Sequence, residues 1–176
     1  MFLAGCSSRG VKLSADDIFT IPVSAFPNGW RMGTAYQESE FGTQNTFFVQ
    51  YSSETFQHAI YWFVHYESEE AASDAFHRYR GATFYSEIGR EIEWEEITKF
   101  ADFDLLIADE YETGCAMTTR NEEAQQQCSA QMRYRNCNLR ISANIDDIYM
   151  SVQEFTEILE YVDNHIDDTE VCRGTN

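Results

Sequence analysis

Carboxylates are the most numerous side chains in this sequence that could do chemistry. Four of them, Asp102, Asp104, Asp109 and Glu110, crowd into one segment. Carboxylate oxygens are preferred calcium ligands, so this segment is the first candidate for a metal site, although the EF-hand pattern is absent. Asp104 and Glu110 are also a candidate pair for an exported hydrolase, since two carboxylates brought together in space can act as acid and base. The simpler alternative is a solvated acidic surface.

Other catalytic and cofactor signatures are missing from the sequence. It has no G-x-S-x-G motif for a serine nucleophile, no glycine-rich phosphate loop and no H-E-x-x-H pair for zinc. His58 and His65 would lie on opposite faces of one predicted strand, so they cannot share a ligand. We therefore predict no catalytic residue and no cofactor, calcium excepted.

Cysteine placement indicates an oxidising compartment. Besides Cys6, the chain has Cys115, Cys128, Cys137 and Cys172, and none shows C-x-x-C spacing. Four cysteines allow two disulfides in three connectivities, and such bonds persist outside the cytosol. The alternative is four reduced thiols in a cytosolic protein.

Residues 128–145 alternate between apolar and polar side chains in two runs, which predicts a β-hairpin. A two-residue turn at Asn136-Cys137 would pair Tyr134 with Leu139 and place every apolar side chain on one face. The preceding run, Leu105 to Met117, has the alternation of a third strand.

The lengths of these elements predict two disulfides. Cys115 and Cys128 flank a polar connection between strands, so they can pair across its base. The strand at 138–145 advances about 26 Å, and a following helix of about 17 residues returns about 25 Å. Cys172 therefore comes back beside Cys137 at the hairpin turn, which predicts the pairs Cys115–Cys128 and Cys137–Cys172.

The remaining elements complete a prediction of fold class. Further strands are predicted after Trp30, at 45–52, at 57–66 and at 88–97. Ser68 and Ser151 are placed to cap two helices, the second with Glu154 in a capping box. The order of strands and helices predicts an α+β fold. It would have a single antiparallel sheet with helices packed on it, and disulfides would tie the late hairpin and the C-terminal helix.

Aromatic side chains suggest where a ligand cleft could lie. Most of them must belong to the core of so small a domain. Those near predicted loops or strand ends could instead line a ligand cleft or a protein-contact patch, or could belong to the core like the others, namely Tyr36, Phe41, Tyr51, Phe56 and Tyr85.

Composition narrows the class of protein and partner. The chain has 176 residues, 43% of them hydrophobic, which fits one globular domain. It carries 30 acidic and 12 basic residues, for a formal charge of −18. That charge argues against nucleic acid as a partner.

Leu3-Ala4-Gly5-Cys6 resembles a bacterial lipobox. The resemblance implies that a lipid is attached to the Cys6 thiol and that the chain is cleaved just before it. Only Met1 and Phe2 precede the box, so we expect residues 1–12 to hold a truncated signal remnant, the lipobox and a tether. Residues 13–172 would form the single α+β domain and 173–176 a tail. A chance occurrence of the motif in a cytosolic protein is the alternative.

The order of elements also resembles a known architecture. A Gly-Trp pair near the start, a long helix after the third strand, a cysteine-bearing late hairpin and a terminal helix are all present. This order is similar to the extracytoplasmic sensor and lipoprotein domains related to the PknH sensor and PsbP-like folds. The resemblance is architectural, so no functional residue is carried over.

These observations predict a non-catalytic extracytoplasmic domain of a lipid-anchored envelope lipoprotein. Its partners would be the membrane, through the lipid anchor, and an unknown protein or small-molecule ligand that it binds or senses; no nucleic acid is expected. The alternatives are an exported hydrolase with a carboxylate pair and a structural accessory subunit of a membrane complex.

Overall fold

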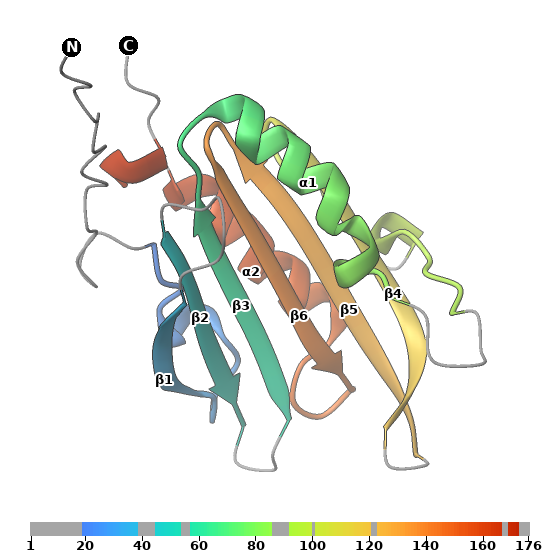
Figure 1. Cartoon of the computed structure of the whole chain (residues 1–176). Helices are drawn as coiled ribbons and strands as arrows, with labels where there is room; N and C mark the ends of the chain where they lie inside the picture. The colour runs from blue at the N-terminus through green and yellow to red at the C-terminus, as the bar shows by residue number, and fades with distance from the viewer. Residues whose placement is uncertain are drawn as a thin grey trace, which may run out of the picture.

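The computed structural model describes residues 19–38, 45–53, 57–85, 92–99, 101–120, 123–166 and 169–172. One six-stranded antiparallel sheet has the order β1-β2-β3-β6-β5-β4 (Figure 1). The strands are β1 (Arg31–Glu38), β2 (Asn45–Ser52), β3 (His58–His65), β4 (Glu110–Arg120), β5 (Glu123–Tyr134) and β6 (Cys137–Ile145). The helices are α1 (Glu69–Thr83) and α2 (Val152–His165), with short 3-10 turns η2 (Val23–Ala25), η3 (Ile97–Lys99) and η5 (Glu170–Cys172). The predicted lipobox, tether and tail lie outside the described residues.

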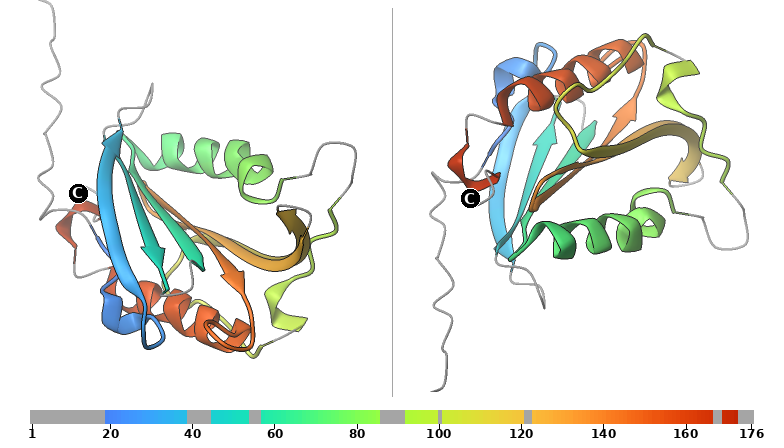
Figure 2. Two further views of the ribbon diagram at one scale, coloured as in Figure 1. Left: turned by 90° about the horizontal axis from the view of Figure 1, so that it is seen from below. Right: turned by 90° about the horizontal axis from the view of Figure 1, so that it is seen from above.

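The two helices cover opposite faces of the sheet, which gives the molecule three layers (Figure 2). The predicted fold class, an α+β fold with one antiparallel sheet and helices packed on it, is therefore confirmed. The observed order is three strands, a helix, three strands and a helix, because the additional strand predicted at 88–97 is not among the strands of the sheet. Since side chains alternate along each strand, the face under α1 and the face under α2 have different compositions.

The face under α2 forms the main hydrophobic core. Strand positions of one parity meet the apolar side of α2, and the largest of these side chains are fully buried. They include Tyr61, Phe63, Met132, Leu139, Ile141, Phe155, Ile158 and Leu159. This continuous apolar layer supplies most of the burial that stabilises the fold.

Two buried tyrosines hold the first described residues against this core. The hydroxyl of Tyr51 donates to the carbonyl of Ile21 at 2.7 Å, and that of Tyr61 donates to the carbonyl of Phe19 at 3.0 Å. Burial raises the pKa of both phenols, so each stays protonated and able to donate. Residues 19–21 are thus fastened by side chains, although they lie outside the sheet.

Both helices begin where the sequence predicts. The Ser68 hydroxyl accepts a hydrogen bond from the Ala71 amide at 3.1 Å. At α2, the Ser151 hydroxyl accepts from the Glu154 amide and the Glu154 carboxylate accepts from the Ser151 amide, which is the predicted capping box. Each cap satisfies amide groups that have no partner inside the helix.

The late hairpin has the predicted face but a different register. Tyr134 pairs with Cys137, not with Leu139, so the turn is Arg135-Asn136 and the predicted pairing is wrong by two residues. A slip of two residues preserves which side chains share a face, which explains why the alternating pattern did not exclude it. Arg135 adopts a φ of 52°, and its amide donates to the Asp109 carboxylate. This contact fixes the observed turn.

The strand predicted at 88–97 does not form in its described part. Only Glu95 pairs with β4, in an isolated bridge to Cys115. Ile97 is fully buried and begins η3, so the chain turns into the core instead of continuing along the strand edge. Residues 88–91 lie outside the described residues.

The run predicted as a strand from Leu105 starts later, at Glu110. The reason is Asp163 on α2, which is 3% exposed. Its carboxylate accepts hydrogen bonds from the amides of three successive residues, 106, 107 and 108, and from the Tyr134 hydroxyl, at 2.7 to 3.0 Å. These amides are held in a loop and cannot enter a sheet ladder.

Both disulfides have the connectivity expected from the sequence. Cys115 and Cys128 lie directly opposite each other on β4 and β5. Cys137, at the start of β6, is joined to Cys172 in η5, which follows α2. The late hairpin and the C-terminal segment are therefore tied together as predicted.

Candidate functional site

The four carboxylates that the sequence groups together have separate contacts in the structure. Asp104 accepts a hydrogen bond from the Tyr111 hydroxyl at 2.8 Å. Asp109 and Glu110 both bind the Arg133 guanidinium, at 3.1 Å and 2.6 Å. All four carboxylates, including Asp102, belong to the described residues. Among the described residues, no cluster of three or more His, Cys, Asp or Glu side chains is placed to hold a metal. Calcium binding stays a prediction, which thermal unfolding with and without millimolar calcium tests.

The carboxylate pair considered for a hydrolase is not brought together. Glu110 faces α1, where it meets Ser73 and His77. Asp104 binds Tyr111, whose ring packs on the opposite side against Phe103 and the main core. Because neighbouring residues of a strand project to opposite faces, Glu110 and Tyr111 hold these carboxylates on different sides of β4. The bond to Asp104 also raises the pKa of the Tyr111 phenol, and burial adds to this shift.

The histidines are dispersed, as their parity predicts. His58 lies on the face under α1, within hydrogen-bond distance of Gln50. His65 lies at the other end of β3, where its Nε2 is 2.8 Å from the Asn136 amide nitrogen. Burial lowers the pKa of His65, so the neutral imidazole is favoured there.

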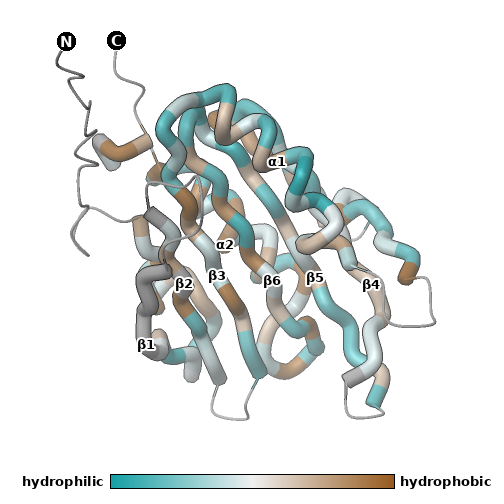
Figure 3. The backbone as a smooth tube through the Cα atoms, in the orientation of Figure 1, coloured by the Kyte–Doolittle hydropathy of each residue, from teal (hydrophilic) through white to brown (hydrophobic). Residues whose placement is uncertain are grey.

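Helix α1 covers only one end of its face of the sheet (Figure 1). Side-chain hydrogen bonds fix it over that end: Asn138 donates to the carbonyl of Ala72 at 2.7 Å, and Thr83 donates to Gln131 at 3.2 Å. α1 ends at Thr83, and no described helix covers the other end of β3, β6, β5 and β4. Figure 3 shows hydrophilic residues along that part of β5.

The uncovered end holds a depression of about 350 Å³, which we call the neutral hollow. Its size falls within the range of small-ligand pockets. Among the residues that the structure describes, none that lines the hollow is Asp, Glu, Lys or Arg, although the chain carries a formal charge of −18. The lining consists of His58, Ile60, Tyr85, Thr118, Thr119, Gln125, Gln127, Ser142, Ala143 and Asn144.

Hydrogen bonds made by lining side chains hold the neutral hollow in shape. The Tyr85 hydroxyl donates to the Gln127 carbonyl oxygen at 2.9 Å, and the Gln125 amide donates to Gln57 at 2.9 Å. These bonds use one end of each amide. In the described part of the chain the side-chain nitrogen of Gln127 and the side-chain oxygen of Gln125 meet no protein partner. One donor and one acceptor therefore stay available to a ligand.

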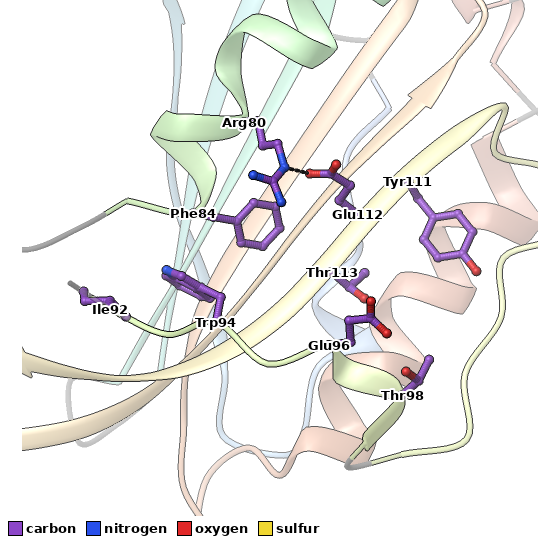
Figure 4. Close-up of a pocket in the computed structure, with 9 residues that line it drawn as sticks. All are labelled: Arg80, Phe84, Ile92, Trp94, Glu96, Thr98, Tyr111, Glu112 and Thr113. Atoms are coloured by element: carbon purple, nitrogen blue, oxygen red, sulfur yellow. Dashed lines mark hydrogen bonds and ion pairs between the residues drawn. The ribbon is translucent and has the colours of Figure 1, made fainter.

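Aromatic rings separate the neutral hollow from a second depression. The Trp94 ring lies edge-to-face against both Phe84 and Tyr85, and its Nε1 donates to the Tyr85 carbonyl at 3.1 Å. Gly114 makes this arrangement possible, because a Cβ there would lie 3.3 Å from the Glu95 oxygen and 3.4 Å from the Phe84 ring. The second depression, the edge groove, has a volume of about 660 Å³ (Figure 4).

The edge groove differs from the neutral hollow in its charged groups. Its lining comprises Arg80, Phe84, Ile92, Trp94, Glu96, Thr98, Tyr111, Glu112 and Thr113. Arg80 binds Glu112 at 2.8 Å, as Figure 4 shows, whereas Glu96 has no ion-pair partner among the described residues. The described lining of the groove therefore carries a net negative charge.

One residue that lines the neutral hollow was predicted from the sequence to lie near a cleft. Tyr85, one of the aromatic residues expected near a cleft, lines the neutral hollow. Tyr51 is fully buried, so it belongs to the core, which was the alternative to a cleft. Tyr36, Phe41 and Phe56 are residues of whose side chains the structure gives no description. The glutamines of β5 were missed. In the sequence, Gln125 and Gln127 alternate with Gln126 and Cys128, which indicates that the two residues share one face of the strand. The pattern does not show which part of that face a helix covers.

Comparison with known proteins gives a similarity of fold. No protein-family model matches the chain, and no curated protein matches it. A solved structure, the extracellular domain of PknH from Mycobacterium tuberculosis, matches with a TM-score of 0.51 and 8% sequence identity. The match covers 80% of this chain and 86% of that chain. No helix in the described part is long and apolar enough to span a membrane. At this identity the chain shares the fold of that extracellular domain, as its element order indicated.

Proposed function

We propose that this chain is a non-catalytic extracytoplasmic domain that binds a small neutral ligand in the neutral hollow, and that a lipid on Cys6 anchors it to the envelope. The observation that carries the proposal is the neutral, hydrogen-bonding lining in a strongly acidic protein. The ligand would carry several hydroxyl or amide groups, as a sugar does.

The chemistry of the hollow supports a neutral ligand over a charged one. A cation would need a carboxylate, and the described lining of the hollow offers none. An anion would be opposed by the protein's formal charge of −18 and would meet no Lys or Arg among the described lining residues. The amides of Gln125 and Gln127 match hydroxyl groups, and Ile60 offers an apolar contact for a sugar ring.

The proposed location is supported by two features besides the lipobox-like motif. Two disulfides occur in the structure, and disulfides persist in oxidising compartments. The structural neighbour is described as an extracellular domain, which favours the same side of the membrane. The hydrolase alternative loses its named pair, because Asp104 and Glu110 lie on different sides of β4.

Location and anchor are tested by intact mass and peptide mapping under non-reducing conditions, on protein extracted from the native host's membranes. The proposal expects a chain that starts at an acylated Cys6 and contains both disulfides. An unmodified soluble chain with free thiols would contradict it.

Ligand binding is tested by native mass spectrometry after incubation with the neutral low-molecular-weight fraction of the host envelope. Wild-type protein is expected to retain a bound species, and Gln127→Glu, which places a charge in the hollow, is expected to lose it. Gln153→Glu makes the same change on the exposed side of α2 and should behave as wild type. Equal retention by all three proteins would show that the ligand binds elsewhere.

A further inference from the structure

β4 is an edge strand of the sheet, and every second residue along it directs its backbone N–H and C=O away from β5. The Glu95 amide donates to the Cys115 carbonyl at 2.9 Å, and the Cys115 amide donates to the Glu95 carbonyl at 2.8 Å. The N–H and C=O of Cys115 therefore point away from β5. Backbone directions alternate along an antiparallel strand, so Tyr111 and Thr113 also direct their N–H and C=O outward.

The outward groups of Tyr111 and Thr113 border the edge groove. Residues 111, 112 and 113 all line it, so the edge of the strand itself forms one wall (Figure 4). The chain that pairs with Cys115 turns away at the buried Ile97, and Glu96 and Thr98 then form the facing wall. In the described part of the chain, the outward backbone groups of Tyr111 and Thr113 have no hydrogen-bond partner.

We propose that the edge groove binds an extended, basic segment of a protein partner, which adds to β4 as a strand at Tyr111 and Thr113. The segment continues the antiparallel pairing that Glu95 begins. This inference goes beyond the neutral hollow and does not depend on it.

Backbone geometry argues for a peptide. The edge of β4 offers backbone N–H donors and C=O acceptors in a row at the spacing of a strand. Only another extended chain can form hydrogen bonds with all of these groups. Side chains in the groove then select among peptides. Phe84 and Trp94 offer aromatic surface for an apolar side chain, and Glu96 is available to a lysine or arginine.

Charge argues against a second copy of this chain as the occupant. Pairing of two copies along β4 would bring the Glu96 and Glu112 carboxylates of both copies together. Each copy also has a formal charge of −18, and this repulsion opposes association. A basic partner gains from the same charges.

The proposal is tested with a short fluorescein-labelled peptide of alternating lysine and valine, in a fluorescence anisotropy titration of the oxidised protein. Main-chain pairing gives the affinity, so the exact order of side chains is secondary. We expect saturable binding that weakens with salt, and slower hydrogen exchange at the Tyr111 and Thr113 amides. A peptide of alternating glutamate and valine should not bind.

Variants separate strand addition from general attraction between charges. Thr113→Pro removes an N–H that points away from β5, so the β4·β5 pairing is retained. We expect it to weaken binding about tenfold, the loss equivalent to one or two hydrogen bonds. Met117→Pro removes the equivalent outward N–H on the other side of the Glu95 bridge and should change affinity less than about twofold. Melting temperatures of both variants show that the fold is kept.

A second pair of variants tests the groove without altering the backbone. Glu96→Arg should weaken binding about threefold to tenfold, whereas Glu93→Arg, an equally exposed change outside the groove, should have less than half that effect. The proposal is overturned if the lysine–valine peptide does not bind saturably. It is also overturned if Thr113→Pro and Met117→Pro weaken peptide binding by the same factor. The same holds if Glu96→Arg and Glu93→Arg weaken it equally. The neutral hollow is untouched by these variants, so its test stands apart.

Discussion

The two faces of the sheet are built from the same strands and serve different ends. Under α2, most alternate residues of the central strands are apolar and buried, and they pack with α2 in the main core. Under α1, the same strands present Gln, Ser, Asn and His side chains, and the helix covers only one end. The first face stabilises the fold, and that stability allows the second to keep uncovered polar groups in fixed positions.

The largest expected difference between the faces is the cost of removing an apolar side chain. Phe155 on α2 is completely buried, so Phe155→Ala should cost about 3 to 5 kcal/mol of unfolding free energy. Ile60, which lines the neutral hollow, is only half-buried, so Ile60→Ala should cost about 1 kcal/mol. Urea unfolding of the two variants under oxidising conditions measures both. Equal losses would break the comparison.

The disulfides, which lie on the α2 side, should rank by the length of chain that they close. Replacing Cys137 and Cys172 together by alanine removes a bond across a separation of 35 residues and should cost about 4 kcal/mol. Replacing Cys115 and Cys128, separated by 13 residues, should cost about 3 kcal/mol. Calorimetry of the two double variants gives the ranking, and a reversed order would show that native-state contacts, not chain length, decide it.

Asp163 is a buried acidic residue on the apolar face, and its removal sharpens the comparison. Asp163→Ala leaves three backbone amides and the Tyr134 hydroxyl without their acceptor, so we expect a loss of about 3 kcal/mol. Asp102→Ala removes an exposed carboxylate from the neighbouring segment and should stay within about 0.5 kcal/mol of wild type. Chemical unfolding of the pair tests whether the loop at 106–108 depends on this one side chain.

The smallest expected effect is the dependence of unfolding free energy on pH. Burial lowers the folded-state pKa of His65 below its ordinary value of 6.5. As pH falls through 6.5, the unfolded chain binds the proton first, so stability is lost on acidification, by at most about 1.4 kcal/mol per pH unit. His65→Gln should flatten this part of the curve of unfolding free energy against pH. Identical slopes for wild type and variant would contradict the assignment.

Much of the fold was accessible from the sequence, because its signals are local. The capping box at Ser151 and the parity of the late hairpin need only neighbouring residues, and strand and helix lengths were enough to pair Cys137 with Cys172. The errors arose where a distant group decides. The carboxylate of Asp163 holds 106–108 as a loop, and that of Asp109 binds the Arg135 amide and so fixes the turn.

The candidate site was less accessible for the same reason. Gln125 and Gln127 alternate in a way that shows which side chains share a face, but α1 decides which part of that face stays open. The edge groove depends on Ile97 turning into the core, which follows from three-dimensional packing. A polar residue on a central strand is a signal that a sequence reader can use, once the extent of the covering helix is known.

The two tyrosine hydroxyls that hold Phe19 and Ile21 have a mechanical consequence. If the chain is tethered through its N-terminal segment, tension enters the fold at these residues, which are secured by side-chain bonds and packing without a β ladder. Such an attachment yields one bond at a time under load, whereas strands sheared along a ladder must break many together. Residues 19–21 would therefore detach before the sheet deforms, and the neutral hollow and the edge groove would keep their shape while the tether is pulled.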